Sequence, residues 1–404
     1  MIAPTPRVAV DVRALQRGFK SHQGRGIGRY VRSLLEAMLP LDRERRLGFV
    51  ADADGELEGL GRRSEERLYR IPAPRWIDRL GRDAIHLRQH VYWPRALPEL
   101  PFDLFHFCSQ TDAPVGFGRS YVVTVLDLIP HRLPDLYSRG KNRARFLLGR
   151  WLERRALARA RGLIAISEYT RGDLTRLCGI PAERIAVCPL GVRSGLAAAS
   201  EEAVAALCRR HRLHPGYLLY VGGIDRRKNI SFLLEVLRAI VVRRPETELV
   251  LAGRYRDDPD FPDLVARVQR LGLEQSTRLA GYIPEEELAA LYSGASVFVY
   301  PSLYEGFGLP PLEAMACGAP VVAADRTALP EVLGHAALFA DPEDVAEFAE
   351  AILSLLDHRE RRAELGAAGL RQARRFTWEA TARATLDAYR RFADLPGLDA
   401  GETS

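Results

Sequence analysis

The chain has little lysine, few cysteines and no long apolar run. Its only lysines are Lys20, Lys141 and Lys228, so the formal net charge of +6 comes almost entirely from arginine. Five scattered cysteines without a C-x-x-C pair argue against a disulfide framework and a zinc site. No run approaches the ~18 apolar residues that cross a bilayer, and the first residues lead into a strand without the apolar core of a signal peptide. These absences indicate a cytoplasmic protein.

The excess of arginine raises the question of an anionic partner. Nucleic acid is not expected, because the sequence has no basic tail, zinc knuckle or aromatic-basic RNA-binding motif. Residues 141–159 combine arginines with apolar residues such as Trp151 and Leu152. This pattern fits either a helix on an anionic membrane surface or an ordinary helix with a solvated arginine face. The general arginine content favours the ordinary helix, and a peripheral membrane contact is the open alternative.

Strands and helices alternate through both halves of the chain, a rhythm typical of parallel sheets. A chain of 404 residues is too long for one ordinary core, so two domains are expected. The predicted fold class is α/β, with two Rossmann-like doubly wound parallel sheets facing each other across a cleft. We predict a first domain over 1–192, a linker up to residue 200, a second domain over 201–377 and a final helix over 378–396 that crosses back to the first domain. The expected strands are 8–12, 47–51, 104–107, 121–126 and 162–167, then 217–221, 249–252, 278–282, 297–300 and 321–323.

Candidate binding residues fall at the ends of these strands, where ligands bind in open α/β sheets. Residues 23–28 follow the first strand and open the first helix, and their glycines, including Gly26 and Gly28, permit close backbone approach to a substrate. The glycine spacing is not that of a dinucleotide-binding loop. Residues 222–229 follow a strand of the second half and bring a cluster of cations to a strand-to-helix junction, where they favour phosphate. The cations are Arg226, Arg227 and Lys228.

The stretch YPSLYEGFGLPPLEAMAC, residues 300–317, places Glu305 and Glu313 on either side of a glycine-proline turn. A strand runs into the turn, and a helix is predicted to begin at the two prolines, with Glu313 in its first turn and Gly318 at its end. The loop offers backbone N–H groups at the positive end of that helix, so we expect a phosphate to bind between the two acids. Glu313 can then accept hydrogen bonds from sugar hydroxyls. A dipole-stabilising Glu313 with a solvated Glu305 explains the pair alone equally well.

Taken together, these features resemble retaining glycosyltransferase family 4, whose members use nucleotide sugars and have the GT-B fold. The resemblance spans nearly the whole chain. It is most specific in the E-x7-E element of Glu305 and Glu313 and in Pro320-Val-Val-Ala323 and Leu329-Pro-Glu-Val332. Weaker matches lie in the family's order at 26–30, 165–170 and 227–229.

The resemblance implies a donor site in the second domain. Glu313 would bind the ribose hydroxyls, and the base would stack near Tyr282 and Ile283. Lys228 and Arg227 would neutralise the diphosphate, so no metal or other cofactor is implied. Retention in the family is explained by front-side attack, in which the departing phosphate takes the acceptor's proton. The transferred sugar and its phosphate would be held by Glu305 and the loop residues Gly306, Phe307, Gly308 and Leu309.

Two positions depart from the family's pattern. Leu126 stands where relatives often carry the histidine of a T-x-H-D stretch. Gly223 stands where many carry an arginine, so the second cation must come from Arg226 or Arg227. The polar candidates near Leu126 are Asp127, to which we assign a catalytic role, and His106 and His131, which we place on the acceptor side with Gly26 and Gly28.

The expected activity is hexosyl transfer to a glycan or lipid-linked acceptor in cell-surface polysaccharide synthesis. GDP-mannose is the best-matching donor, because the chain resembles the mannosyltransferase-like branch. A GT-B sugar-nucleotide epimerase and a non-catalytic sugar-nucleotide-binding protein are the alternatives. Asp52-Ala-Asp54 mimics the metal-binding D-x-D motif of the GT-A fold, but Gly55 makes it an ordinary Asp-rich turn, so no metal site is predicted.

Overall fold

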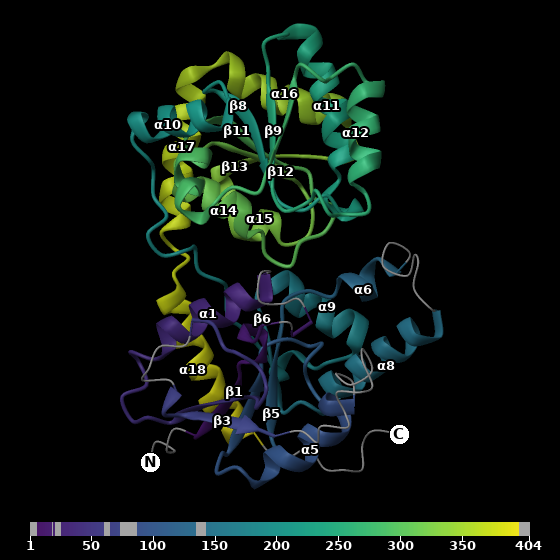
Figure 1. Cartoon of the computed structure of the whole chain (residues 1–404), viewed down its shortest axis with the longest axis vertical. Helices are drawn as coiled ribbons and strands as arrows, with labels where there is room; N and C mark the ends of the chain where they lie inside the picture. Colours follow the sequence, from purple (N-terminus) through teal and green to yellow (C-terminus); the bar gives the residue numbers. More distant parts are fainter. Residues whose placement is uncertain are drawn as a thin grey trace. The chain divides into compact units, whose positions relative to one another are not determined.

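The computed structural model describes residues 6–17, 19–20, 26–59, 65–72, 87–134 and 143–395. The chain folds into two compact units (Figure 1). The first unit comprises Met1–Gly191 together with Trp378–Ser404, and the second comprises Val192–Thr377. Each unit is built around its own parallel sheet, which confirms the α/β class with two Rossmann-like sheets.

The first sheet has seven strands in the order β3-β2-β1-β4-β5-β6-β7, all parallel. It grows outward from β1 in both directions, since Val8 pairs with Leu47 on one side and with Leu104 on the other. The central strands are buried along their whole length, as expected for a sheet covered on both faces. The strands are β1 (Val8–Asp11), β2 (Leu47–Asp52), β3 (Leu68–Ile71), β4 (Leu104–Phe107), β5 (Tyr121–Val125), β6 (Gly162–Ala165) and β7 (Ile185–Val187).

One helix of the first unit, Glu168–Cys178, has a cap at each end. The Ser167 hydroxyl accepts the Thr170 N–H at its start, and Gly179 follows its end in the left-handed conformation. The arginine-rich helix begins at Arg143; residues 141 and 142 of the predicted basic segment lie outside the described residues. The helices are α1 (Gly26–Met38), α5 (Trp93–Ala96), α6 (Ile129–Arg132), α8 (Arg143–Arg159), α9 (Glu168–Cys178) and α18 (Trp378–Asp394), with short 3₁₀ or π turns at Arg13–Leu15, Arg88–Tyr92, Leu97–Glu99 and Ala182–Arg184.

The C-terminal helix α18 is part of the first unit's core and packs along α1. The Trp378 ring lies 6.2 Å from that of Tyr30. The Tyr389 hydroxyl lies 2.6 Å from Nδ1 of His106 on β4. Gly162 on β6 leaves room for the Phe392 ring, because a Cβ there would come within 2.4 Å of it. The last helix therefore completes the sheet's cover.

The second sheet has six parallel strands in the order β10-β9-β8-β11-β12-β13. Helices again cover it, and Asp344 caps one of them by accepting the N–H groups of Ala346 and Glu347. The strands are β8 (Tyr217–Val221), β9 (Leu249–Ala252), β10 (Thr277–Gly281), β11 (Ala295–Tyr300), β12 (Val321–Ala324) and β13 (Ala337–Ala340). The helices are α10 (Glu201–His211), α11 (Ile230–Arg243), α12 (Phe261–Arg270), α13 (Leu288–Ser293), α14 (Leu309–Ala316), α15 (Leu329–Leu333), α16 (Val345–Asp357) and α17 (Arg359–Ala373), with 3₁₀ turns at Arg226–Lys228, Glu285–Glu287 and Gly334–Ala336.

Helix α14 begins earlier than its prolines suggest. Its first residue is Leu309, and Pro310 and Pro311 occupy the first turn, where proline costs no hydrogen bond. The predicted place of Glu313 in the first turn is therefore wrong, because the one additional residue, Leu309, puts it in the second turn. Gly318, at φ +79°, follows the end of the helix as expected.

Candidate active site

The loop between β11 and α14 is held in one shape by a glycine and two packing contacts. Gly308 has φ +104°, and a Cβ there would lie 2.7 Å from the Leu329 side chain, so a larger residue would not fit. Phe307 is buried edge-on against Phe376, with ring centroids 5.7 Å apart. The Leu303 N–H donates to the Arg227 carbonyl at 2.8 Å. This bond joins the loop to the turn after β8, so the two motifs found in the sequence lie side by side.

Glu305 is buried within this loop and surrounded by cations. Its Oε1 accepts hydrogen bonds from Lys228 Nζ at 2.6 Å and from Arg227 Nη1 at 3.1 Å. Its backbone N–H donates to the Thr327 hydroxyl at 3.0 Å. Burial raises the pKa of Glu305, but the charges of Lys228 and Arg227 outweigh that effect and lower the pKa to about 2. The carboxylate is therefore ionised and fixed in place.

Lys228 lies in the 3₁₀ turn after β8 and is only 8% exposed. Its ammonium donates to Glu305 and to the Tyr300 hydroxyl, the latter at 2.7 Å. Burial lowers the pKa of Lys228, and Glu305 opposes that shift. An ammonium has three N–H donors, and no described residue accepts the third. Lys228 can thus keep both protein partners and donate to an additional anion.

Neighbouring cations complete this turn. Arg227 also pairs with Asp225, Nε to Oδ1 at 3.1 Å. Arg226 is exposed at the start of the same turn. Gly223, where relatives often carry arginine, has only the Asp225 carboxylate near the position of a Cβ, at 3.5 Å. The predicted cluster of Arg226, Arg227 and Lys228 thus lies at one strand end, with Arg227 and Lys228 against Glu305.

Glu313, on α14, is 4% exposed and has neighbours unlike those of Glu305. Its Oε2 accepts a hydrogen bond from the Tyr292 hydroxyl at 3.1 Å. Its Oε1 lies 3.8 Å from Nε of Arg193. A buried carboxylate with hydroxyl and guanidinium neighbours is suited to accept hydrogen bonds from sugar hydroxyls.

The segment after β10, predicted to receive the base, presents one aromatic side chain. Tyr282 is 52% exposed, with the Arg254 guanidinium 4.3 Å from its ring centre. Ile283 is buried. The Gly281 N–H donates to the Tyr255 hydroxyl at 3.0 Å, which fixes the start of the segment. Of Tyr282 and Ile283, only Tyr282 has an exposed ring on which the base could stack.

The acceptor-side candidates lie in the first unit, and their surroundings differ. His106 is fully buried on β4 between Tyr389 and Thr124, and burial lowers its pKa to about 3, so it is neutral and structural. His131, at the end of α6, lies 3.1 Å from Glu153 Oε2. Asp127 follows β5, is half-buried and accepts the Ile129 N–H at 3.1 Å. Gly26 and Gly28 begin α1, and the preceding residues 21–25 lie outside the described residues.

The D-x-D stretch begins at Asp52, the last residue of β2, and turns at Ala53 and Asp54 as predicted. Asp52 is 8% exposed, and its Oδ1 accepts the Trp93 indole N–H at 2.9 Å. The Gln16 amide donates to the Asp52 carbonyl at 2.8 Å and accepts the Asp52 N–H at 3.0 Å. Among the described residues no group of three or more His, Cys, Asp or Glu side chains could hold a metal ion.

Sequence reasoning missed a buried ion pair at the end of β1. Arg13 is 1% exposed, and its Nη2 lies 2.7 Å from Asp11 Oδ2 and donates to the Asp112 carbonyl at 3.1 Å. The same guanidinium lies 3.5 Å from the centre of the Trp93 ring. Lys20 pairs with the Asp112 carboxylate at 2.8 Å. The Asp-Val-Arg sequence at a strand end is the signal that could have identified this cluster, which fixes the strand end that precedes α1.

Two family models match most of the chain. Residues 24–195 match the model described as Glycosyltransferase Family 4, and residues 209–372 match the one described as Glycosyl transferases group 1. O-antigen chain mannosyltransferase B of Escherichia coli is 38% identical over 273 residues, which are 67% of this chain and 70% of that protein. The serotype-specific mannosyltransferase WbdA of Escherichia coli is 30% identical over 71% of this chain but only 37% of its own length.

Solved structures show the same architecture. Anabaena HepE in complex with UDP and glucose has a TM-score of 0.72 at 18% identity, covering 95% of this chain and 98% of that one. Sucrose-phosphate synthase from Thermosynechococcus elongatus has a TM-score of 0.70 at 22% identity, with coverage of 95% and 98%. At such identities the likeness establishes the fold alone, whereas the family rests on the models and the mannosyltransferase of 38% identity. The chain belongs to glycosyltransferase family 4 and has the GT-B fold.

Proposed function

We propose that this glycosyltransferase moves mannose from GDP-mannose to a glycan or lipid-linked acceptor, with retention of the anomeric configuration, in cell-surface polysaccharide synthesis. The observation that carries the proposal is the cluster of Glu305, Lys228 and Arg227 beside the glycine loop at the start of α14. Glu313 lies further along the same helix. Similarity to proteins named mannosyltransferases supports mannose as the transferred sugar.

The cluster suits a reaction whose leaving group gains negative charge. As the bond between C1 of the sugar and the phosphate oxygen breaks, charge develops on the nucleoside diphosphate. Lys228, Arg227 and Arg226 would stabilise it together with the N–H groups at the start of α14. A bond then forms between the acceptor oxygen and C1, and the acceptor's proton passes to the departing phosphate. We propose that these cations and dipoles do the work without a metal ion.

Glu305 would keep the cations in position before the donor arrives. Because its Oε1 accepts from both Lys228 and Arg227, it holds the two donors on one side of the loop. A phosphate that accepts the third N–H of Lys228 needs no rearrangement of the pair. Because these cations are in position before the reaction, they would stabilise the charge of the transition state and so lower the activation barrier, not only bind the donor.

Turnover of GDP-mannose tests the proposal. The protein is incubated with labelled GDP-mannose and a lipid-linked oligosaccharide, and the product is analysed by NMR for its anomeric configuration. An α-mannoside is the expected product. Conversion to the 2-epimer of the sugar nucleotide would favour the epimerase alternative, and binding without turnover would favour the non-catalytic one.

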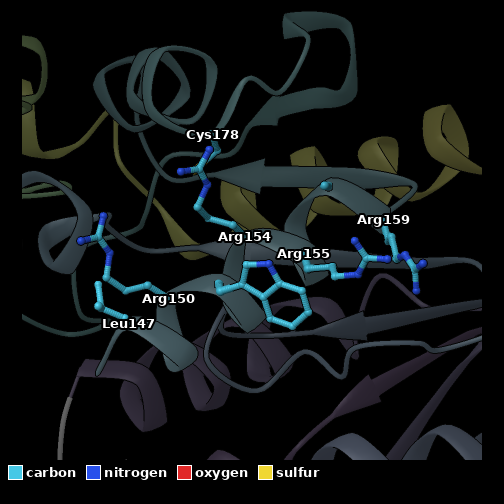
Figure 2. A pocket seen from close by; sticks show the side chains of 8 residues that line it. Leu147, Arg150, Arg154, Arg155, Arg159 and Cys178 are labelled. Carbon is cyan, nitrogen blue, oxygen red and sulfur yellow. The ribbon is translucent and has the colours of Figure 1, made fainter. Parts of the chain in front are cut away.

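We further propose that the protein is cytoplasmic and contacts the inner membrane face through α8. This helix exposes Leu147 (52%), Leu148 (55%) and Trp151 (54%) beside its arginines. Figure 2 shows the side chains of Arg150, Arg154, Arg155 and Arg159 around one pocket, with Cys178 also in its lining. The pocket has a volume of about 490 Å³. Apolar side chains among cations are suited to an anionic lipid surface. In the described part of the chain, no helix combines the length and apolar character of a membrane span.

A further inference from the structure

The segment that follows Gly191 is a fixed part of the second unit. The Val192 N–H donates to the Phe376 carbonyl at 2.9 Å, and Phe376 packs on Phe307 of the donor loop. Further along, the Ala199 N–H donates to the Ser293 hydroxyl at 2.9 Å. Residues expected to form a plain linker are therefore attached to the elements that surround Glu313.

Arg193 uses this fixed backbone to reach between two acids. Its Nη1 lies 2.6 Å from Oε2 of Glu285, in the 3₁₀ turn that follows the Tyr282 segment. Its Nε lies 3.8 Å from Oε1 of Glu313. The side chain is 18% exposed, whereas that of Glu313 is 5% exposed. The guanidinium thus lies between the segment proposed for the base and the acid proposed for the ribose.

The guanidinium has donors left over in this position. Its Nε and Nη2 are buried, and neither has a hydrogen-bond acceptor among the described residues. The 3.8 Å between Nε and Glu313 Oε1 is too long for a hydrogen bond. One hydroxyl oxygen about 2.8 Å from each atom would close that gap, donating its proton to the carboxylate and accepting from Nε. Buried donors without acceptors are costly, so a ligand hydroxyl would be favoured here.

We propose that Arg193 is a ribose-binding residue of the donor site and forms, with Glu313, a two-sided clamp on one ribose hydroxyl of the nucleoside diphosphate. The inference rests on the proposed function, since it takes the donor to be a nucleotide sugar. It assigns a role to a residue outside the motifs that identify the site. A guanidinium paired with Glu285 on one edge presents Nε and Nη2 together on its other side, toward Glu313.

The test compares ligands that differ by one hydroxyl. Titration calorimetry measures GDP, 2′-deoxy-GDP, 3′-deoxy-GDP and pyrophosphate, and the matching UDP series, against the parent protein and Arg193→Ala. The parent should bind the ribonucleotide more tightly than one of its deoxy forms. Arg193→Ala should bind the ribonucleotide roughly tenfold to hundredfold more weakly, lose that discrimination, and bind pyrophosphate as the parent does.

Arg210→Ala is the matched control, because Arg210 forms a similar pair with Glu287 in the same turn and is 68% exposed. It should leave all affinities unchanged. Arg193→Lys keeps the charge but not the planar fork, so it should restore only part of the lost affinity.

Equal losses for the ribonucleotide and pyrophosphate, unchanged discrimination in Arg193→Ala, or full rescue by Arg193→Lys would overturn the clamp. A parent that binds no nucleoside diphosphate would instead contradict the proposed function. The two failures are therefore distinguishable.

Discussion

Glu305 and Glu313 have different neighbours, so their removal should affect different steps. Glu313 lies against Tyr292 and Arg193, whereas Glu305 holds Lys228 and Arg227. Glu313→Ala should weaken GDP binding by about 1.5 to 3 kcal/mol, the value of a hydrogen bond to a charged group. Glu305→Ala should mainly lower kcat, by a similar amount in activation free energy. Calorimetry and steady-state kinetics check this, and unchanged affinity in Glu313→Ala would remove the ribose assignment.

Glu305 should also make stability depend on pH. Its folded pKa of about 2 is below its ordinary value of 4.5, so ionised Glu305 stabilises the fold above pH 4.5, and this stabilisation is lost as pH falls through 2. Glu305→Gln should therefore lower the free energy of unfolding by roughly 3 kcal/mol at pH 7 and by less at pH 3. Urea unfolding at both pH values measures the difference. Glu343→Gln, at a 77% exposed side chain, is the control; an equal loss for Glu305→Gln at both pH values would contradict the argument.

For individual residues, the sequence predicted the neighbourhoods that form within one strand-loop-helix unit or at one strand end. Glu305 and Glu313 share one strand-loop-helix unit, and Lys228 stands at a strand end, so their neighbourhood could be inferred from the chain alone. Arg193 could not be found in this way, because its proximity to Glu313 depends on backbone bonds to Phe376, far along the chain. The enclosure of His106 by Tyr389 likewise depends on where α18 packs.

Helix α8 is the element whose role the sequence left open. Its half-exposed Trp151 and leucines favour a membrane surface over a merely solvated arginine face. Charge reversal at Arg150, Arg154 and Arg155 should reduce binding to phosphatidylglycerol vesicles at least about tenfold at low salt, because each basic residue near an anionic surface contributes about 1 kcal/mol. Parent binding should fall as salt rises. Flotation with vesicles measures both effects, and calorimetry should show unchanged GDP binding.

A control variant with the same change in net charge tests whether the charges of α8 itself matter for vesicle binding, rather than the net charge of the protein. Arg359, Arg361 and Arg374 are exposed in the second unit, and their reversal to glutamate should leave vesicle binding near the parent's level. Trp151→Ala tests the apolar contribution and should weaken binding without changing the charge. Equal vesicle binding by the α8 charge-reversal variant and the parent would return this helix to a solvated face.

The strands that sequence reasoning missed are β3, β7 and β13, all at or next to the ends of their sheets. Tyr69 and Arg70 of β3 are exposed, so the apolar run that identifies a buried strand is absent there. β7 has only three residues. The central strands are almost entirely buried and were predicted. Edge position alone does not explain these misses, because β10 is also an edge strand and was predicted.

At the scale of the whole molecule, the alternation of strands and helices predicted two parallel sheets, and the structure confirms them. The sequence located the boundary between the two units less accurately than it did the two sheets. Val192 already belongs to the second unit, although a run of small residues after it looks like a linker. Composition indicates where a chain is flexible in isolation, whereas the hydrogen bonds of Val192 and Ala199 form only in the folded unit.

The proposal that the whole reaction needs no metal ion can be tested directly. Asp52 is buried, its Oδ1 accepts the Trp93 N–H and its Oδ2 faces Arg88 at 3.9 Å, so its carboxylate is already engaged within the protein. Lys228 and Arg227 of the second unit both bind Glu305, and under the proposed function they would neutralise the charge that develops on the diphosphate. Mannosyl transfer should therefore retain at least about half its rate after treatment with EDTA, whereas a metal-dependent transfer would lose several orders of magnitude. Lys228→Ala should lower kcat in EDTA and in manganese alike, because a metal would not replace the missing ammonium. Loss of transfer in EDTA with recovery on adding manganese would contradict this account and make Asp52 and Asp54 the residues to substitute next.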